Sequence, residues 1–159
     1  MKKTIFLTIF LVTALFAQEL KVKAKLFNAD QKSGVSTFEG DVNIVKGSDE
    51  LNASKVIINT NSNQEPTKFI AEGNASFIIK TLEGAVYSGK AQKVIYLPQE
   101  KEYHFFKDVH LKQINEKKEI IGEEVVLKTI EGKAYAKGAD KEPVIMIFDL
   151  PEDKKDTNK

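Results

Sequence analysis

The chain has 159 residues, of which 42% are hydrophobic and 30% are charged, and its formal net charge is +1. This size and composition suit one domain with an apolar core and exclude a chain that is disordered throughout. The absence of cysteine excludes disulfides, thiolate nucleophiles and cysteine-ligated metal sites. All 24 basic residues are lysine. The absence of arginine argues against sequence-specific recognition of nucleic acid, because arginine is the usual base contact.

The N-terminus has the pattern of a secretory signal peptide. Two lysines at residues 2–3 precede an apolar run over residues 4–16, which is shorter than the about 20 residues of a membrane-spanning helix. We expect cleavage after Ala17, and cleavage after Ala14 is the alternative. Removal of residues 1–17 leaves 22 lysines against 23 acidic residues. Such a near-neutral balance provides no large field that would attract nucleic acid or an anionic membrane.

Beyond residue 18 apolar and polar residues alternate with a period of two, which is typical of half-buried β-strands. The first run, residues 20–26, alternates four apolar residues with three lysines. Residues 28–34 are predicted to form a turn, and residues 59–66 and 113–118 are predicted loops within the same domain. We predict no substantial helix. The inward residues of the first run are Leu20, Val22, Ala24 and Leu26.

A weak internal repeat underlies these strands. Residues 38–44 (FEGDVNI) resemble residues 71–77 (AEGNASF) and 105–111 (FFKDVHL), and residues 135–140 form a degenerate fourth copy. The copies recur roughly every 31 to 34 residues. No pair of short strands can bury its apolar face alone, so stacking of the pairs predicts a continuous two-faced β structure. A second strand follows each of the first three copies, at residues 53–58, 91–96 and, more loosely, 122–127.

The chain ends with an apolar strand and a polar tail. Residues 144–148 (VIMIF) form the predicted last strand, and the polar residues after Pro151 are predicted to be disordered. The predicted boundaries are therefore a cleaved signal peptide over residues 1–17, a β domain over residues 18–150 and a tail over residues 151–159.

No catalytic or metal-binding motif is present, because the sequence lacks GxSxG, HExxH, P-loop and GxGxxG patterns. His104 and His110 lie six residues apart on one predicted strand. At about 3.3 Å per residue they are about 20 Å apart, which is too far for a shared metal. We therefore predict a protein that is not an enzyme, with no catalytic residue, no metal and no cofactor.

Small residues interrupt the inward face of the predicted strands. They are flanked by large apolar residues, so they either leave a groove in the interior or permit sheet twist and close approach of backbones. The spacing leaves both interpretations open. The small inward residues are Gly40, Ala71, Gly73, Ala75 and Gly138.

Three segments carry a resemblance to a known family. Residues 29–31 (ADQ), 37–44 (TFEGDVNI) and 51–56 (LNASKV) resemble the opening pattern A/S-D-Q, F-x-G-x-V-x-I and L-x-A-D-x-V of the OstA-like family of lipopolysaccharide transport proteins. The resemblance runs from about residue 20 to residue 148. Ser54 stands where the family has aspartate, and Lys107 stands where the other copies of the repeat have glycine.

The resemblance implies an all-β fold, an open twisted β-jellyroll of solenoid-like, stacked antiparallel strands with a hydrophobic interior. It also implies a periplasmic carrier that shields the acyl chains of lipid A during lipopolysaccharide transport from the inner to the outer membrane. The implied partners are lipopolysaccharide, like-folded inner-membrane and outer-membrane transport components and a head-to-tail homo-oligomer, and not nucleic acid. The residues expected to line the lipid-binding groove are Phe38, Val42, Ile44, Val56, Ile58, Phe69, Ala71, Ala75, Phe77, Ile79, Val94, Tyr96, Phe105, Val109, Leu111, Val125 and Leu127.

The two ends of such a sheet are also predicted to be binding edges. The lysines of residues 20–26 project from a face and leave the backbone edge open, and residues 144–148 carry no charge before Asp149. Addition of strands from like-folded partners would satisfy both edges and gives contacts that do not close. The alternatives are a membrane-anchored paralogue of the same fold and a periplasmic structural β-solenoid with a filled core. A secreted hydrolase is disfavoured by the lack of a nucleophile and base.

Overall fold

The computed structural model describes residues 18–150, so the predicted signal peptide and the predicted tail lie outside the described residues. Within residues 18–150 all regular elements are β-strands, as predicted, and none of that part of the chain forms a helix long and apolar enough to cross a membrane. The strands are β1 (Leu20–Lys23), β2 (Leu26–Asp30), β3 (Val35–Lys46), β4 (Asp49–Thr60), β5 (Pro66–Lys80), β6 (Val86–Leu97), β7 (Glu102–Gln113), β8 (Lys118–Lys128), β9 (Lys133–Lys137) and β10 (Ile145–Phe148).

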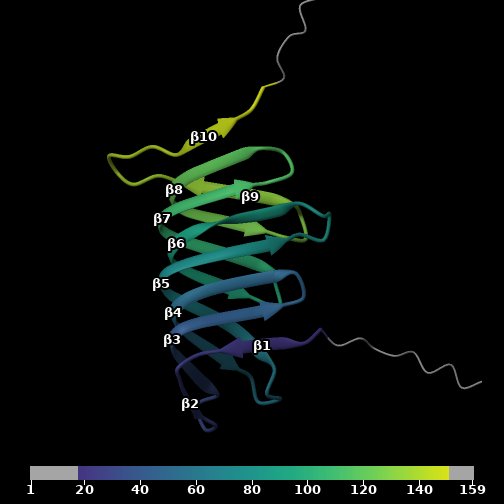
Figure 1. The fold of residues 1–159 in the computed structure, drawn as a ribbon, viewed down its shortest axis with the longest axis vertical. Helices are drawn as coiled ribbons and strands as arrows, with labels where there is room; N and C mark the ends of the chain where they lie inside the picture. Colours follow the sequence, from purple (N-terminus) through teal and green to yellow (C-terminus); the bar gives the residue numbers. More distant parts are fainter. Residues whose placement is uncertain (1–17, 151–159) are drawn as a thin grey trace, which may run out of the picture.

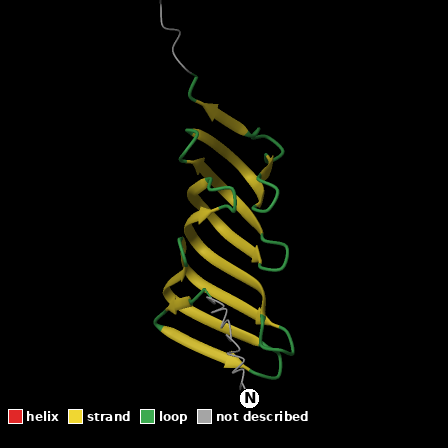
Figure 2. Ribbon diagram, turned by 90° about the vertical axis from the view of Figure 1, so that its right-hand side faces the viewer, coloured by secondary structure: helices red, strands yellow, loops and turns green. Residues whose placement is uncertain are grey.

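The strands form one antiparallel sheet in which neighbours along the chain are mostly neighbours in space. The order is β1-β3-β4-β5-β6-β7-β8-β10, with β2 also paired to β3 and β9 also paired to β8. The strands stack along the long axis of the molecule, with β1 and β2 at one end and β10 at the other (Figure 1). Figure 2 shows that the long strands cross the molecule obliquely and curve around its interior.

Each copy of the repeat contains a bend at its centre. The strand register shifts at residues 39–42 of β3, 72–75 of β5 and 106–109 of β7, as expected for β-bulges. The two central residues of each bend have positive φ angles, as in Gly40 (81°) followed by Asp41 (46°). Gly73 (84°) occupies the same position on β5, and glycine suits it because it has no Cβ. These glycines allow the strand to bend, and they do not leave a groove in the interior of the protein.

The bends divide the sheet into two halves that face each other. Half-sheet I comprises β2, β9, the first halves of β3, β5 and β7 and the second halves of β4, β6 and β8; half-sheet II comprises β1, β10 and the remaining halves. The ring centroids of Phe77 in half-sheet II and Phe105 in half-sheet I are 4.4 Å apart. The core therefore lies between the inner faces of the two half-sheets.

The first predicted strand is in fact two strands. The chain bends at Lys25, whose backbone N–H donates to two carbonyl oxygens of β3 at 3.1 and 3.0 Å. Beyond this bend Phe27 packs against Phe38, with 4.8 Å between ring centroids, whereas Leu26 is 66% exposed. The prediction that Leu26 faces inward was wrong, because the bend reverses the alternation within residues 20–26.

Two further predictions fail where strands begin and end. β2 continues to Asp30 and pairs with β3, so the turn predicted over residues 28–34 is confined to residues 31–34. The fourth repeat copy is interrupted at its bend, because β9 ends at Lys137 and the chain returns to the sheet only at β10. Gly138 therefore lies in a connecting loop and not on the inner face of a strand.

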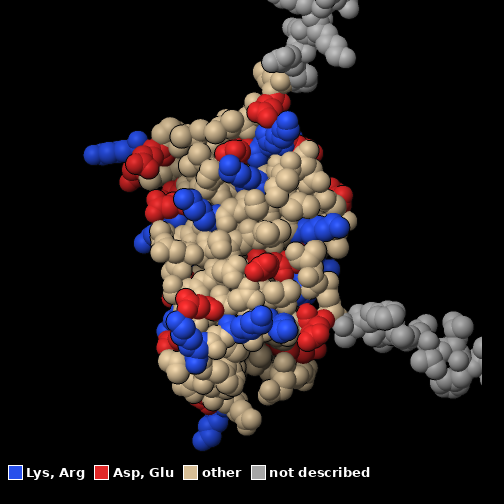
Figure 3. Space-filling model, in the orientation of Figure 1, with Lys and Arg blue, Asp and Glu red and all other residues tan. Residues whose placement is uncertain are grey.

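Charged side chains are interspersed over the face drawn in Figure 3, where blue and red patches alternate. Several form ion pairs between neighbouring strands, such as Lys55 with Glu39 at 3.1 Å and Lys93 with Glu72 at 3.2 Å. These side chains are 40% to 47% exposed, so each pair contributes little to stability. The pairs lie on the outer faces of the strands and leave the interior apolar.

Candidate functional site

The residues predicted to line a groove all lie between the two half-sheets. Phe38, Phe69 and Tyr96 are partly buried and pack against the core, and the others are buried within it. They come together because residues of one alternation share a face of a strand, and both inner faces point to the same interior. The structure thus places the set in one apolar cluster, and its binding of lipid stays a proposal.

The interior is filled in its C-terminal half. Phe105, Val109, Val125 and Leu127 have no exposed surface. In this half the side chains of the two half-sheets interdigitate as in an ordinary protein core. Ala75, on the inward face of β5, is likewise without exposed surface, so this half of the predicted lining is packed in the described structure.

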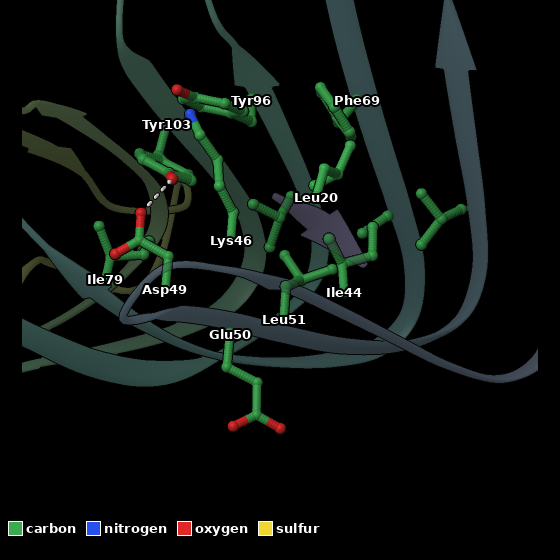
Figure 4. Close-up of a pocket in the computed structure, with 13 residues that line it drawn as sticks. Leu20, Ile44, Lys46, Asp49, Glu50, Leu51, Phe69, Ile79, Tyr96 and Tyr103 are labelled. Carbon is green, nitrogen blue, oxygen red and sulfur yellow. Dashed lines mark hydrogen bonds between the residues drawn. The ribbon is translucent and has the colours of Figure 1, made fainter. Parts of the chain in front are cut away.

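The N-terminal half contains a cavity of about 60 Å³, shown in Figure 4. Its wall is almost wholly apolar, and the charged residues among those that line it lie on β3 and β4. Glu50 points away from the cavity in Figure 4, whereas Lys46 and Asp49 lie at its rim. The lining residues are Leu20, Ile44, Lys46, Asp49, Glu50, Leu51, Val56, Phe69, Ala71, Ile79, Val94, Tyr96 and Tyr103.

Two polar contacts cross the rim of this cavity from half-sheet II to half-sheet I, and we call them the rim contacts. The hydroxyl of Tyr103 donates to Asp49 Oδ2 at 3.3 Å, and Lys46 Nζ lies 5.6 Å from the centroid of the Tyr96 ring. Tyr96 and Tyr103 stack on each other at 4.3 Å. Lys46 and Asp49 are cross-strand neighbours, so one pair of residues in half-sheet II contacts one stacked tyrosine pair in half-sheet I.

The rim contact of Tyr103 is protected by burial. Burial raises the pKa of the Tyr103 hydroxyl far above its usual range, and the nearby charge of Asp49 adds to this rise. The hydroxyl therefore stays protonated and available as a donor at any ordinary pH. The second oxygen of Asp49, Oδ1, accepts from the backbone N–H of Lys80 at 2.9 Å, so both oxygens of this carboxylate have a partner.

The arrangement is suited to binding an apolar ligand. Within residues 18–150 no three acidic, histidine or cysteine side chains are placed to hold a metal ion. His104 and His110 form separate contacts with Glu102 at 3.2 Å and Glu119 at 2.7 Å. The apolar cavity presents contact surface and no nucleophile, and its polar groups are confined to the rim.

The predicted groove set omitted several residues that the structure brings to the cavity or core. Leu51 and Tyr103 line the cavity, while Tyr87 and Ala91 belong to the buried core. The alternation of inward and outward residues within a strand could have identified some of them, since Tyr103 lies two residues before Phe105 and so shares its face of β7. The register shift within β6, between Lys90 and Lys93, obscured this signal for Tyr87 and Ala91.

Comparison with known proteins identifies the family. Residues 21–133 match the family described as LptA/(LptD N-terminal domain) LPS transport protein. The chain belongs to this family. Its members are transport proteins and not enzymes, so the predictions of an OstA-like transport protein and of a non-enzymatic role are confirmed. A search of curated proteins gives no match.

A solved structure shares the fold. It is the crystal structure of LptH, the LptA homologous periplasmic component of the conserved lipopolysaccharide transport device from Pseudomonas aeruginosa. The TM-score is 0.75 at 20% sequence identity, and the match covers 84% of this chain and 96% of LptH. The similarity confirms the predicted open, all-β architecture of the LptA type.

Proposed function

We propose that the chain is an LptA-type periplasmic carrier that shields the acyl chains of lipid A between its half-sheets as lipopolysaccharide passes from the inner to the outer membrane. The observation that supports it is an apolar cavity with polar contacts across its rim, in a member of a lipopolysaccharide transport family. The polar part of the lipid needs no enclosed site, because it can stay in water outside the half-sheets.

The half-sheets must separate to admit an acyl chain. The cavity measures about 60 Å³, which is smaller than the about 150 Å³ that holds a benzene ring. Burial of roughly twelve CH₂ groups at about 0.8 kcal/mol each contributes about 10 kcal/mol. Breaking the hydrogen bond to a carboxylate and the cation–π contact at the rim costs about 2–4 kcal/mol together. The free energy gained by burying one acyl chain is therefore larger than the free energy needed to break the rim contacts.

Release of such a chain into water is unfavourable by the same amount. We propose that the chain passes directly to a similar interior in a neighbouring protein, driven by an energised partner. The two ends of the sheet suit this transfer, because β1 and β2 at one end and β9 and β10 at the other have no further strand beside them within the described chain. Phe27 at one end is 63% exposed and Phe148 at the other is 50% exposed. These edges are suited to strand addition by like-folded membrane components or by another copy.

Site-specific photocrosslinking tests the carrier function. A photoreactive phenylalanine analogue at Phe69, which lines the cavity, should crosslink to lipopolysaccharide in cells. The matched control is the same analogue at Ile70, the next residue of β5, whose side chain has the opposite direction because alternate residues of a strand point to opposite faces. Equal crosslinking at both positions, or none at either, would contradict an interior lipid site.

Crosslinking also separates this proposal from the structural β-solenoid, which the filled C-terminal half favours. A solenoid with a structural role alone predicts no lipid adduct at Phe69. The mass of the protein isolated from cells distinguishes a cleaved carrier from a membrane-anchored paralogue, because only the carrier loses the predicted signal peptide.

The edge contacts require a separate experiment. A chain that ends before Pro143 lacks β10, and it should form fewer end-to-end oligomers than the full chain in light scattering and chemical crosslinking. A chain that ends at Leu150 keeps β10 and is the control. Unchanged oligomerisation of the shorter chain would exclude β10 as a binding edge.

A further inference from the structure

One lysine is placed differently from the others along the sheet. Lys46 and Lys118 occupy inward positions, because Lys46 shares the alternation of Ile44 and Lys118 shares that of Ile120. Lys107 shares the alternation of Phe105 but is exposed at the bend of β7. Lys118 forms an ion pair with Glu116. Lys46 has no carboxylate oxygen within 4.0 Å among residues 18–150, and its ammonium group lies instead over an aromatic ring.

A polar hollow of about 210 Å³ adjoins the apolar cavity at this point. Lys46, Asp49, Tyr96 and Tyr103 line both spaces. The aliphatic stem of an inward lysine can therefore lie against the cavity while its ammonium group reaches the hollow. The cavity and the hollow together have the profile of an amphiphile, with an apolar part enclosed and a polar part at the opening.

Two further lysines, Lys80 and Lys101, line the hollow, and neither has a carboxylate partner within 4.0 Å in the described chain. Lys101 has a φ of 52°, a conformation that is uncommon for residues other than glycine. It is held by Thr129, whose backbone N–H and hydroxyl donate to the Lys101 carbonyl at 3.1 and 2.8 Å. The acidic residue that lines the hollow is Asp49, and both of its oxygens already have donors.

We propose that Lys46, with Lys80 and Lys101, binds a phosphate monoester on the headgroup of an acylated ligand whose chain occupies the apolar cavity. Lysine binds phosphate as a point charge, and hydrogen bonds between charged groups are the stronger ones. A phosphate monoester carries close to two negative charges, which suits three ammonium groups beside one engaged carboxylate. This inference rests on the proposed function, since the acyl chain brings the phosphate to the hollow.

Calorimetric titration of the protein with three ligands tests the site. Dodecyl phosphate carries chain and phosphate, dodecyl maltoside carries the same chain with a neutral headgroup, and inorganic phosphate carries no chain; the detergents are used below their critical micelle concentrations. Lys101→Met, at a lysine that lines the hollow and not the apolar cavity, should weaken dodecyl phosphate binding about tenfold and leave dodecyl maltoside binding unchanged. Lys90→Met, the same change at an exposed position of β6, should alter neither, and Lys101→Arg should retain dodecyl phosphate binding.

The outcomes separate this site from the carrier function. If Lys101→Met binds dodecyl phosphate as tightly as the unchanged protein, the headgroup site is wrong, while binding of dodecyl maltoside would still support the apolar site. If neither detergent binds, both proposals are wrong. If inorganic phosphate binds as tightly as dodecyl phosphate, the lysines form a site for free anions and the lipid headgroup assignment is overturned. Retained dodecyl maltoside affinity in Lys101→Met shows that the variant is folded.

Discussion

The bend of β7 is a place where one substitution should stabilise the protein. Lys107 has a φ of 63°, whereas the matching residues of β3 and β5 are Gly40 at 81° and Gly73 at 84°. A residue with a Cβ pays about 1–2 kcal/mol in this left-handed region. The Lys107 side chain is exposed and has no ion pair among residues 18–150, so its removal should cost little stability.

The expected gain is the difference between two effects. Lys107→Gly removes the backbone cost of about 1–2 kcal/mol, but the greater freedom of glycine in the unfolded chain opposes it by about 0.5–1 kcal/mol. The net increase in the free energy of unfolding is about 0.5–1 kcal/mol. For a domain of this size such a gain raises Tm by about 1–4 °C.

Urea unfolding and thermal melting, both followed by circular dichroism, measure this gain. Lys107→Ala is the matched control, because it removes the charge and the long side chain but keeps the Cβ; its stability should stay within about 0.5 kcal/mol of the unchanged protein. A glycine variant no more stable than the alanine variant would refute the claim that left-handed backbone at this bend costs stability.

Three other predictions concern the same framework. Gly73→Ala should lower the free energy of unfolding by about 2 kcal/mol or more, because φ is 84° and the new Cβ would lie 2.6 Å from a hydroxyl of β4; an unchanged urea midpoint would contradict this. The pKa of Glu102 lies below its ordinary value of 4.5, chiefly because Lys128 donates a hydrogen bond to its carboxylate. The ionised Glu102 side chain therefore stabilises the folded protein above pH 4.5, and this stabilisation is lost as the pH falls through the lower pKa of the folded state. In Glu102→Gln the urea midpoint should therefore fall less on acidification than in the unchanged protein. The same dependence of the midpoint on pH in both proteins would exclude a contribution from Glu102. Tyr103→Phe removes one rim contact, so it should lower stability by about 1 kcal/mol and speed uptake of a fluorescent fatty acid in stopped-flow mixing; a slower uptake would show that the contact does not restrain entry.

The sequence by itself determined the strands and the direction of their side chains. A period of two is a local property of extended backbone, so the alternation around Phe77 and Phe105 was enough to place both side chains in the interior. The repeat marked three copies as equivalent and Lys107 as the exception to glycine, but the bends at these positions were found only in the structure. Alternation failed at Leu26, because the bend at Lys25, between β1 and β2, reverses the face of the residues that follow it.

Only the tertiary structure decided where the interior is filled and where it is open. Packing depends on the separation of the two half-sheets, which is set by side chains that are far apart in the sequence, such as Phe77 against Phe105. The rim hydrogen bond joins Asp49 to Tyr103 across 54 positions of the chain, and no local pattern predicts such a pair. The sequence specifies which side chains enter the interior, but the distance between the two inner faces is a property of the folded sheet, because each face is held in place by the side chains of the other.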